Sequence, residues 1–140
     1  MEHGSVMNIS PLHHVSLVTS NLERATEFYR DVFGFKQIDR PPFSTAGTWF
    51  AFDSFELHLI VHPDGTFRNN STIDTADAHF AIRVADFEAA IRHFATKGFR
   101  EDAADGDPKR ILVNRKSTAG YPQAYLLDAD RNLIEINAAG

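Results

Sequence analysis

The 140-residue sequence contains no cysteine, which excludes disulfide bonds, thiolate metal ligands and a cysteine nucleophile. It has no apolar run near the roughly 20 residues that a membrane-spanning helix needs, and no signal-peptide pattern opens it. Positive charge is also scarce, because 14 Lys and Arg stand against 19 Asp and Glu for a net charge of −5. We therefore expect a cytoplasmic protein that binds neither a membrane nor nucleic acid.

Hydrophobic residues make up 43% of the chain and charged residues 24%, which is typical of a folded globular protein. The length suits one domain, so we expect residues 1–140 to form a single domain with its own core. Residues 1–9 are expected to be flexible or a remnant of expression, and they are left out of the fold prediction.

An internal repeat organises the chain, and each copy begins at one of the seven histidines. Residues 14–29 match residues 79–94, and with one gap Gly34-Phe35 then matches Gly98-Phe99. The matched positions include His14/His79, Asn21/Asp86, Glu23/Glu88, Ala25/Ala90 and Tyr29/Phe94. Two copies of one supersecondary unit are the simplest interpretation.

Each copy is predicted to be a βαβββ module, which makes the fold class α+β. In both copies a helical pattern follows the opening strand. Ser20 with Glu23 forms a capping box for the first helix, and Asp86 is the N-cap of the second. Gly34 and Gly98 end the two helices. Module one spans about residues 10–63 and module two about residues 77–138. The predicted strands are residues 12–19, 35–39, 48–53, 55–62, 78–84, 99–102, 123–127 and 132–137, and residues 110–115 are a further candidate.

Five stretches carry a resemblance to a known family: Leu12–Leu17, Asn21–Phe35, Phe55–Ile60, His79–Val84 and Tyr125–Ile136. In their order and spacing they resemble the vicinal oxygen chelate superfamily, which contains glyoxalases, bleomycin resistance proteins and extradiol dioxygenases. The resemblance implies that the modules form an open, curled mixed sheet around a metal-binding cleft. It also implies a small-molecule substrate and a homodimer. One departure is Asp128-Ala-Asp-Arg-Asn132, where the family has Asp-Pro-Asp-Gly-Asn.

The resemblance further implies that the first and last strands of each module supply the ligands of one divalent metal. The residues in those places are His14, His58, His79 and Glu135. The repeat supports this set independently, because a pseudo-twofold axis would bring two equivalent pairs to a common centre. Fe, Mn, Ni, Co and Zn all suit these residue types. Glu56 points to the same strand face as His58 and stays open as the alternative fourth ligand.

Glu135 and Glu56 are the candidate catalytic residues, because a carboxylate beside a bound metal can carry a proton. Tyr125, Arg83 and Trp49 are the candidate substrate-binding residues. Each has an ordinary structural explanation as well: a core tyrosine with its hydroxyl at the surface, a solvated edge charge, and core packing. For the ligand positions the ordinary explanations are a hydrogen-bonded or exposed histidine and a salt-bridged carboxylate.

The other histidines receive no functional role. His13 is expected on the strand face opposite His14, His62 in a loop, and His93 on a solvated helix face.

The resemblance favours a metal-dependent enzyme of the glyoxalase-like group, which chelates a small oxygenated substrate for lyase or isomerase chemistry. An Fe(II) extradiol-type dioxygenase and a non-catalytic, drug-binding module of the bleomycin-resistance type are the alternatives. Fosfomycin resistance is disfavoured, because the sequence ends five residues after Glu135, without that subgroup's potassium-binding loop.

Overall fold

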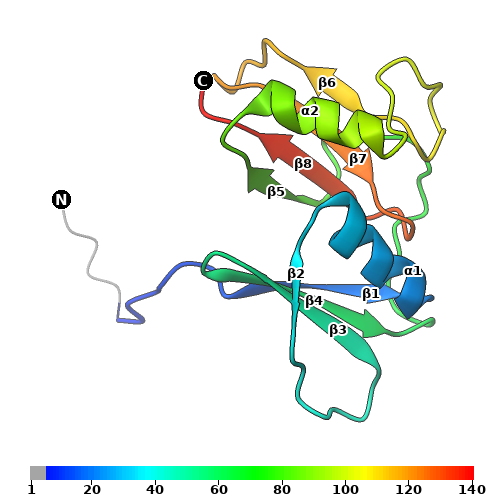
Figure 1. Ribbon diagram of the computed structural model, residues 1–140. Helices are drawn as coiled ribbons and strands as arrows, with labels where there is room; N and C mark the ends of the chain where they lie inside the picture. Colours follow the sequence, from blue (N-terminus) through cyan, green and yellow to red (C-terminus); the bar gives the residue numbers. More distant parts are fainter. Residues whose placement is uncertain (1–5) are drawn as a thin grey trace.

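Each half of the chain forms a four-stranded mixed sheet in the computed structural model, which describes residues 6–140 (Figure 1). The first half comprises β1 (His14–Thr19), α1 (Leu22–Glu27), the π-helix η1 (Phe28–Val32), β2 (Lys36–Ile38), β3 (Gly47–Phe52) and β4 (Phe55–Val61). The second half comprises β5 (His79–Arg83), α2 (Phe87–Thr96), β6 (Leu112–Asn114), β7 (Gln123–Leu127) and β8 (Leu133–Asn137). The strand orders β1-β4-β3-β2 and β5-β8-β7-β6 are the same, which confirms the α+β fold of two βαβββ modules.

The segment between α2 and β6 differs from the prediction, which placed a strand at residues 99–102. A single backbone bridge between Arg100 and Arg110 forms there, and β6 takes the place of the module's second strand. Arg110 donates to the carbonyl of Ala103 at 2.6 Å and pairs with Asp105 at 3.4 Å. These short-range contacts hold residues 103–110 in successive turns, so the chain cannot remain extended beyond Phe99.

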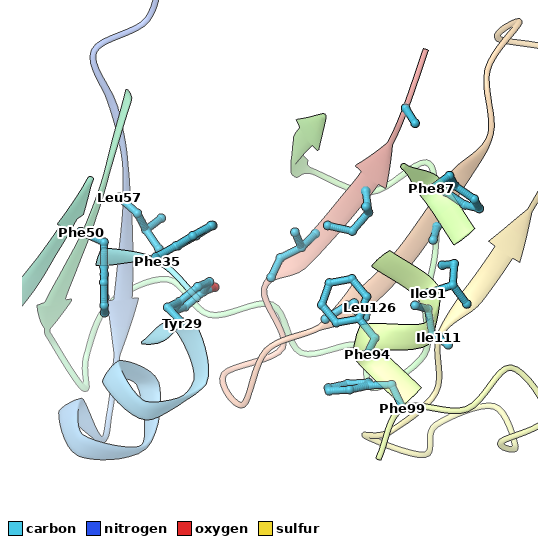
Figure 2. Close-up of a cluster of buried hydrophobic side chains, with 14 of the residues drawn as sticks. Tyr29, Phe35, Phe50, Leu57, Phe87, Ile91, Phe94, Phe99, Ile111 and Leu126 are labelled. Atoms are coloured by element: carbon cyan, nitrogen blue, oxygen red, sulfur yellow. The ribbon is translucent and has the colours of Figure 1, made fainter. Parts of the chain in front are cut away.

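One continuous apolar core joins the two modules (Figure 2). Tyr29, Phe35, Phe50 and Leu57 fill it on the side of the first sheet, and Phe87, Ile91, Phe94, Phe99, Ile111 and Leu126 fill it on the side of the second. Rings meet across the module boundary, since the centroids of Phe33 and Phe94 are 5.3 Å apart. The opposite face of each sheet is left available for polar side chains.

Two buried carboxylates in the turn between β7 and β8 bind module one. The hydroxyl of Tyr29 donates to Asp128 Oδ2 at 2.5 Å, and the hydroxyl of Thr19 donates to Asp130 Oδ2 at 2.6 Å. Asp128 Oδ1 also accepts the backbone N–H groups of Asp130 and Asn132. We refer to Asp128 and Asp130, with these partners, as the inter-module clasp. It fixes where the second sheet sits relative to the first.

The clasp also explains why the predicted capping box does not form at the start of α1. The Ser20 hydroxyl donates to Asp130 Oδ1 at 3.3 Å, so it is not available to the helix. The N-cap is Asn21, whose side chain accepts from the backbone N–H of Arg24 at 3.0 Å. Asp86 does cap α2 as predicted, through the N–H of Ala89.

The turn between β7 and β8 forms even though its sequence departs from the family pattern. Arg131 occupies the position of the family's glycine with φ of 66°, in the left-handed region that glycine adopts most easily. Strand pairing continues on both sides, with Leu127 opposite Leu133.

The expectation for residues 1–9 is only partly addressed, because residues 1–5 lie outside the described residues. Val6 and Ile9 are exposed, at 100% and 74% of their surface. Across residues 6–140, none of the helices combines the length and apolar character that a bilayer crossing requires.

Asp130→Ala is expected to lower the free energy of unfolding by about 2 kcal/mol, because it removes the buried carboxylate that accepts from Thr19, Ser20 and Arg24. Urea denaturation measures the change. Asp39→Ala is the matched control at an exposed carboxylate. Equal stability of the two variants would contradict a structural role for the clasp.

Candidate functional site

Strand register decides which residues of the two modules are equivalent. In module one, Ser16 of β1 lies opposite His58 of β4, which lies opposite Trp49 of β3. His14 comes two residues before Ser16 on the same strand face. Glu56 lies opposite His14 itself.

Module two repeats this arrangement at the corresponding strands. Ala81 of β5 lies opposite Glu135 of β8, which lies opposite Tyr125 of β7, and His79 precedes Ala81 by two residues. Glu135 is therefore the structural counterpart of His58, and Tyr125 that of Trp49. The counterpart of Glu56 is an apolar residue, Leu133, opposite His79.

His14, His58 and Glu56 form a cluster that we call the module-one half-site. The rings of His14 and His58 stack at 4.0 Å, and Trp49 stacks on the other face of His58 at 3.8 Å, nearly parallel. His58 Nε2 lies 2.8 Å from Glu56 Oε1. Trp49 thus fixes the plane of the His58 ring, which leaves the ring 6% exposed.

His13 does not turn away from this cluster as the strand prediction required. Strand β1 begins at His14, so His13 is outside the alternation of the strand. Its Nδ1 lies 2.8 Å from His14 Nδ1, and the two rings meet edge to face.

Glu135 and His79 form the module-two half-site, in which Glu135 is the buried centre. His79 Nε2 lies 3.2 Å from Glu135 Oε1, and the Tyr125 hydroxyl donates to the same oxygen at 3.1 Å. The side-chain amides of Asn137 and Gln123 donate to Oε2 at 2.8 and 3.3 Å. Sequence reasoning missed these two amides, although alternation places each on the strand face of Tyr125 or Glu135.

In module two, Glu135 and Tyr125 have shifted pKa values with identifiable causes. Burial opposes ionisation of Glu135, but the hydrogen bonds from Asn137, Gln123, Tyr125 and His79 outweigh it and lower its pKa. Burial beside Glu135 raises the pKa of Tyr125 to about 12, so its hydroxyl stays protonated and remains a donor. A charged carboxylate is thus held at a buried position.

Module one shows related effects. Burial and the neighbouring His58 and His13 lower the pKa of His14, which favours the neutral imidazole that binds metals. The hydrogen bond from His58 lowers the pKa of Glu56, which makes this carboxylate a weaker base than a free one.

The other sequence candidates lie near these clusters or serve the fold. Arg83 donates to Asn137 Oδ1 at 2.9 Å and covers the ring of Tyr121 at 4.8 Å, so it adjoins the module-two half-site. His93 is exposed but is not merely solvated, since its Nε2 lies 2.6 Å from the carbonyl oxygen of Val32 and joins α2 to module one.

The two half-sites do not converge within one chain. Among residues 6–140, no three His, Asp or Glu side chains lie close enough together to hold one metal ion. Each cluster satisfies its own polar groups by pairing a histidine with a carboxylate.

Comparison with known proteins agrees with the fold. The family model for the glyoxalase/bleomycin resistance protein/dioxygenase superfamily matches residues 11–136. The Arabidopsis thaliana protein named glyoxylase I 4 is 24% identical over 135 residues, which are 95% of this chain and 73% of that protein.

Two solved structures have the same fold at low sequence identity. A glyoxalase family protein from Bacillus anthracis has a TM-score of 0.74 at 20% identity, covering 94% of this chain and 97% of the other. Lactoylglutathione lyase from Agrobacterium tumefaciens has a TM-score of 0.66 at 19% identity, covering 94% and 95%.

Tyr125→Phe is expected to raise the pKa of Glu135 towards its ordinary range, because the carboxylate loses one of its donors. Carbon-13 NMR of the glutamate carboxyls across a pH titration measures the change. Tyr121→Phe, which removes a hydroxyl not bonded to Glu135, is the control. An unchanged titration of Glu135 in Tyr125→Phe would show that this hydrogen bond does not hold the charge.

Proposed function

The chain belongs to the glyoxalase/bleomycin resistance protein/dioxygenase superfamily, and from that premise we propose that it is a metal-dependent enzyme of the glyoxalase-like group. Its substrate is a small molecule with neighbouring oxygens, and its chemistry is of the lyase or isomerase type. The observation that carries the proposal is that His14 and His58 of module one lie at the same register positions as His79 and Glu135 of module two.

The donor atoms fit a divalent metal, but the number available in one chain does not. Imidazole nitrogen and carboxylate oxygen are good ligands for Fe, Mn, Ni, Co and Zn. Within residues 6–140, neither half-site has three of them placed to hold one ion. Two half-sites from different copies supply four donors: His14 and His58 of one copy with His79 and Glu135 of the other. The register equivalence of His58 and Glu135 favours His58 over Glu56 as the ligand.

We propose a homodimer, because a second copy could bring a module-one half-site next to a module-two half-site. Strands β1 and β5 carry His14 and His79, and each lies at the edge of its sheet with one side open to a further strand. Edge strands are natural contact surfaces between copies. In a twofold dimer each pairing of half-sites occurs twice, which gives one complete site per chain.

A metal held by these residues would supply positive charge that stabilises negative charge on the substrate oxygens and lowers their pKa. The remaining chemistry belongs to the chain. Glu135 is held ionised, so it can accept a proton from substrate carbon or oxygen. The neutral Tyr125 hydroxyl orients the carboxylate and can donate to a substrate oxygen that replaces it. Glu56 is the second candidate base, once His58 Nε2 engages another partner.

One observation supports a second candidate function. Because no three-ligand group forms within residues 6–140 of one chain, a drug-binding module that needs no metal is the alternative. The Fe(II) dioxygenase alternative shares the donor set and is separated from the lyase or isomerase by the identity of the bound metal.

Protein purified without an affinity metal is expected to contain about one divalent ion per chain by elemental analysis. His58→Ala and His79→Ala should each reduce this content at least tenfold. His62→Ala is the control. Within residues 6–140, the His62 side chain forms no hydrogen bond or ion pair with a residue of either half-site. Fe would favour the dioxygenase, and Ni, Co, Mn or Zn the lyase or isomerase. Metal-free protein that stays empty after reconstitution would favour the drug-binding module.

Mixing two inactive variants tests whether the site is shared between copies. His14→Ala with His58→Ala removes one half-site, and His79→Ala with Glu135→Ala removes the other. Co-refolded together, the two chains should regain about a quarter of the wild-type metal content, since half of the random dimers hold one intact site of two. Sites formed within single chains would regain none.

A further inference from the structure

A cavity of about 600 Å³ lies at the junction of the two modules and shares His79 with the module-two half-site. Val15 and Leu17 of β1 form one wall, and Phe80 of β5 and Leu133 of β8 form another. The inter-module linker, residues 66–70, closes a third side. The volume is within the range of small-molecule sites, about 300–1,000 Å³.

The walls of this cavity are held in place by specific contacts. Gly65 packs so tightly against β1 that an added Cβ would lie 3.1 Å from a methyl of Val18. Arg68 donates from its guanidinium to the carbonyls of Asn70 and Thr72 at 2.8 and 2.6 Å. A cavity with fixed walls costs little ordering when a ligand enters.

The charged groups in the lining neutralise each other. Arg68 Nε donates to Asp77 Oδ2 at 2.6 Å, and the backbone N–H of Ala78 donates to Asp77 Oδ1 at 2.8 Å. The Arg68 side chain is only 11% exposed. Neither group presents an unpaired charge, so a charged ligand body would lose its hydration without compensation.

His79 connects the cavity to the module-two half-site. His79 is one of the lining residues, and its Nε2 lies 3.2 Å from Glu135 Oε1 while its Nδ1 lies 2.7 Å from the carbonyl oxygen of Asp77. A ligand in the cavity can therefore place one end at His79 and its body against Val15, Leu17 and Phe80.

We propose that this cavity binds the uncharged, apolar body of a small molecule whose neighbouring oxygens point to His79. The substrate is then an uncharged aliphatic chain attached to the vicinal dioxygen head of the proposed function. The linker, which lines the cavity, is the element that determines specificity. The orientation of the head rests on the proposed function, whereas the fit of the body rests on the cavity alone.

The test uses metal-free protein and the uncharged vicinal diols 1,2-butanediol, 1,2-hexanediol and 1,2-octanediol. Titrations followed by amide NMR should show shifts at residues 66–70 and 78–80. The dissociation constant should fall about three- to fourfold for each added methylene until the cavity is full. Adding a terminal ammonium to the six-carbon chain, as in 6-amino-1,2-hexanediol, should weaken binding at least tenfold.

A matched pair of variants checks the location. Thr66 is an exposed residue of the lining and Thr118 an exposed residue outside it, so Thr66→Phe should abolish hexanediol binding and Thr118→Phe should preserve it. Binding that survives Thr66→Phe, or that is insensitive to chain length, overturns the proposal. Because no metal is present, diol binding in a protein that never takes up metal would uphold the cavity assignment while the proposed enzyme fails.

Discussion

The hydrogen bond from Tyr29 to the buried carboxylate of Asp128 is the constraint on which the arrangement of the modules depends. Burial raises the pKa of Asp128, so it needs every donor that surrounds it, and Tyr29 is the donor that comes from the other module. Asp130 adds a second bond to Thr19. The β7–β8 turn is thereby fixed against the start of α1, and the directions of both sheets follow from that contact.

This placement explains why the polar clusters stay separate. The core occupies the space between each sheet and its helix, so the functional histidines lie on the opposite faces. Glu135 then satisfies its charge with donors from its own sheet, and His58 pairs with Glu56 of its own strand. A single chain is complete as a fold, whereas the two halves of the proposed metal centre lie apart within it.

Much of the fold could be predicted from the sequence because the pattern of the βαβββ module occurs twice in it. Alternation located β1, β4, β5, β7 and β8 within two residues, and helical spacing located α2. The failures share a cause: the N-cap Asn21, the contacts of His13 and the loss of the strand after Phe99 depend on partners that spacing cannot reveal. The candidate ligands were identified by type, whereas their division between two surfaces depends on the clasp, which joins residues about a hundred positions apart.

That long separation has a consequence for synthesis of the chain. Thr19 and Tyr29 leave the ribosome long before Asp130 and Asp128 are made, so module one folds for a time without its anchor. During that interval the hydroxyls of Thr19 and Tyr29 lack the carboxylates to which they donate in the complete chain. The placement of the second sheet against the first is therefore fixed late in synthesis, once the β7–β8 turn has been made.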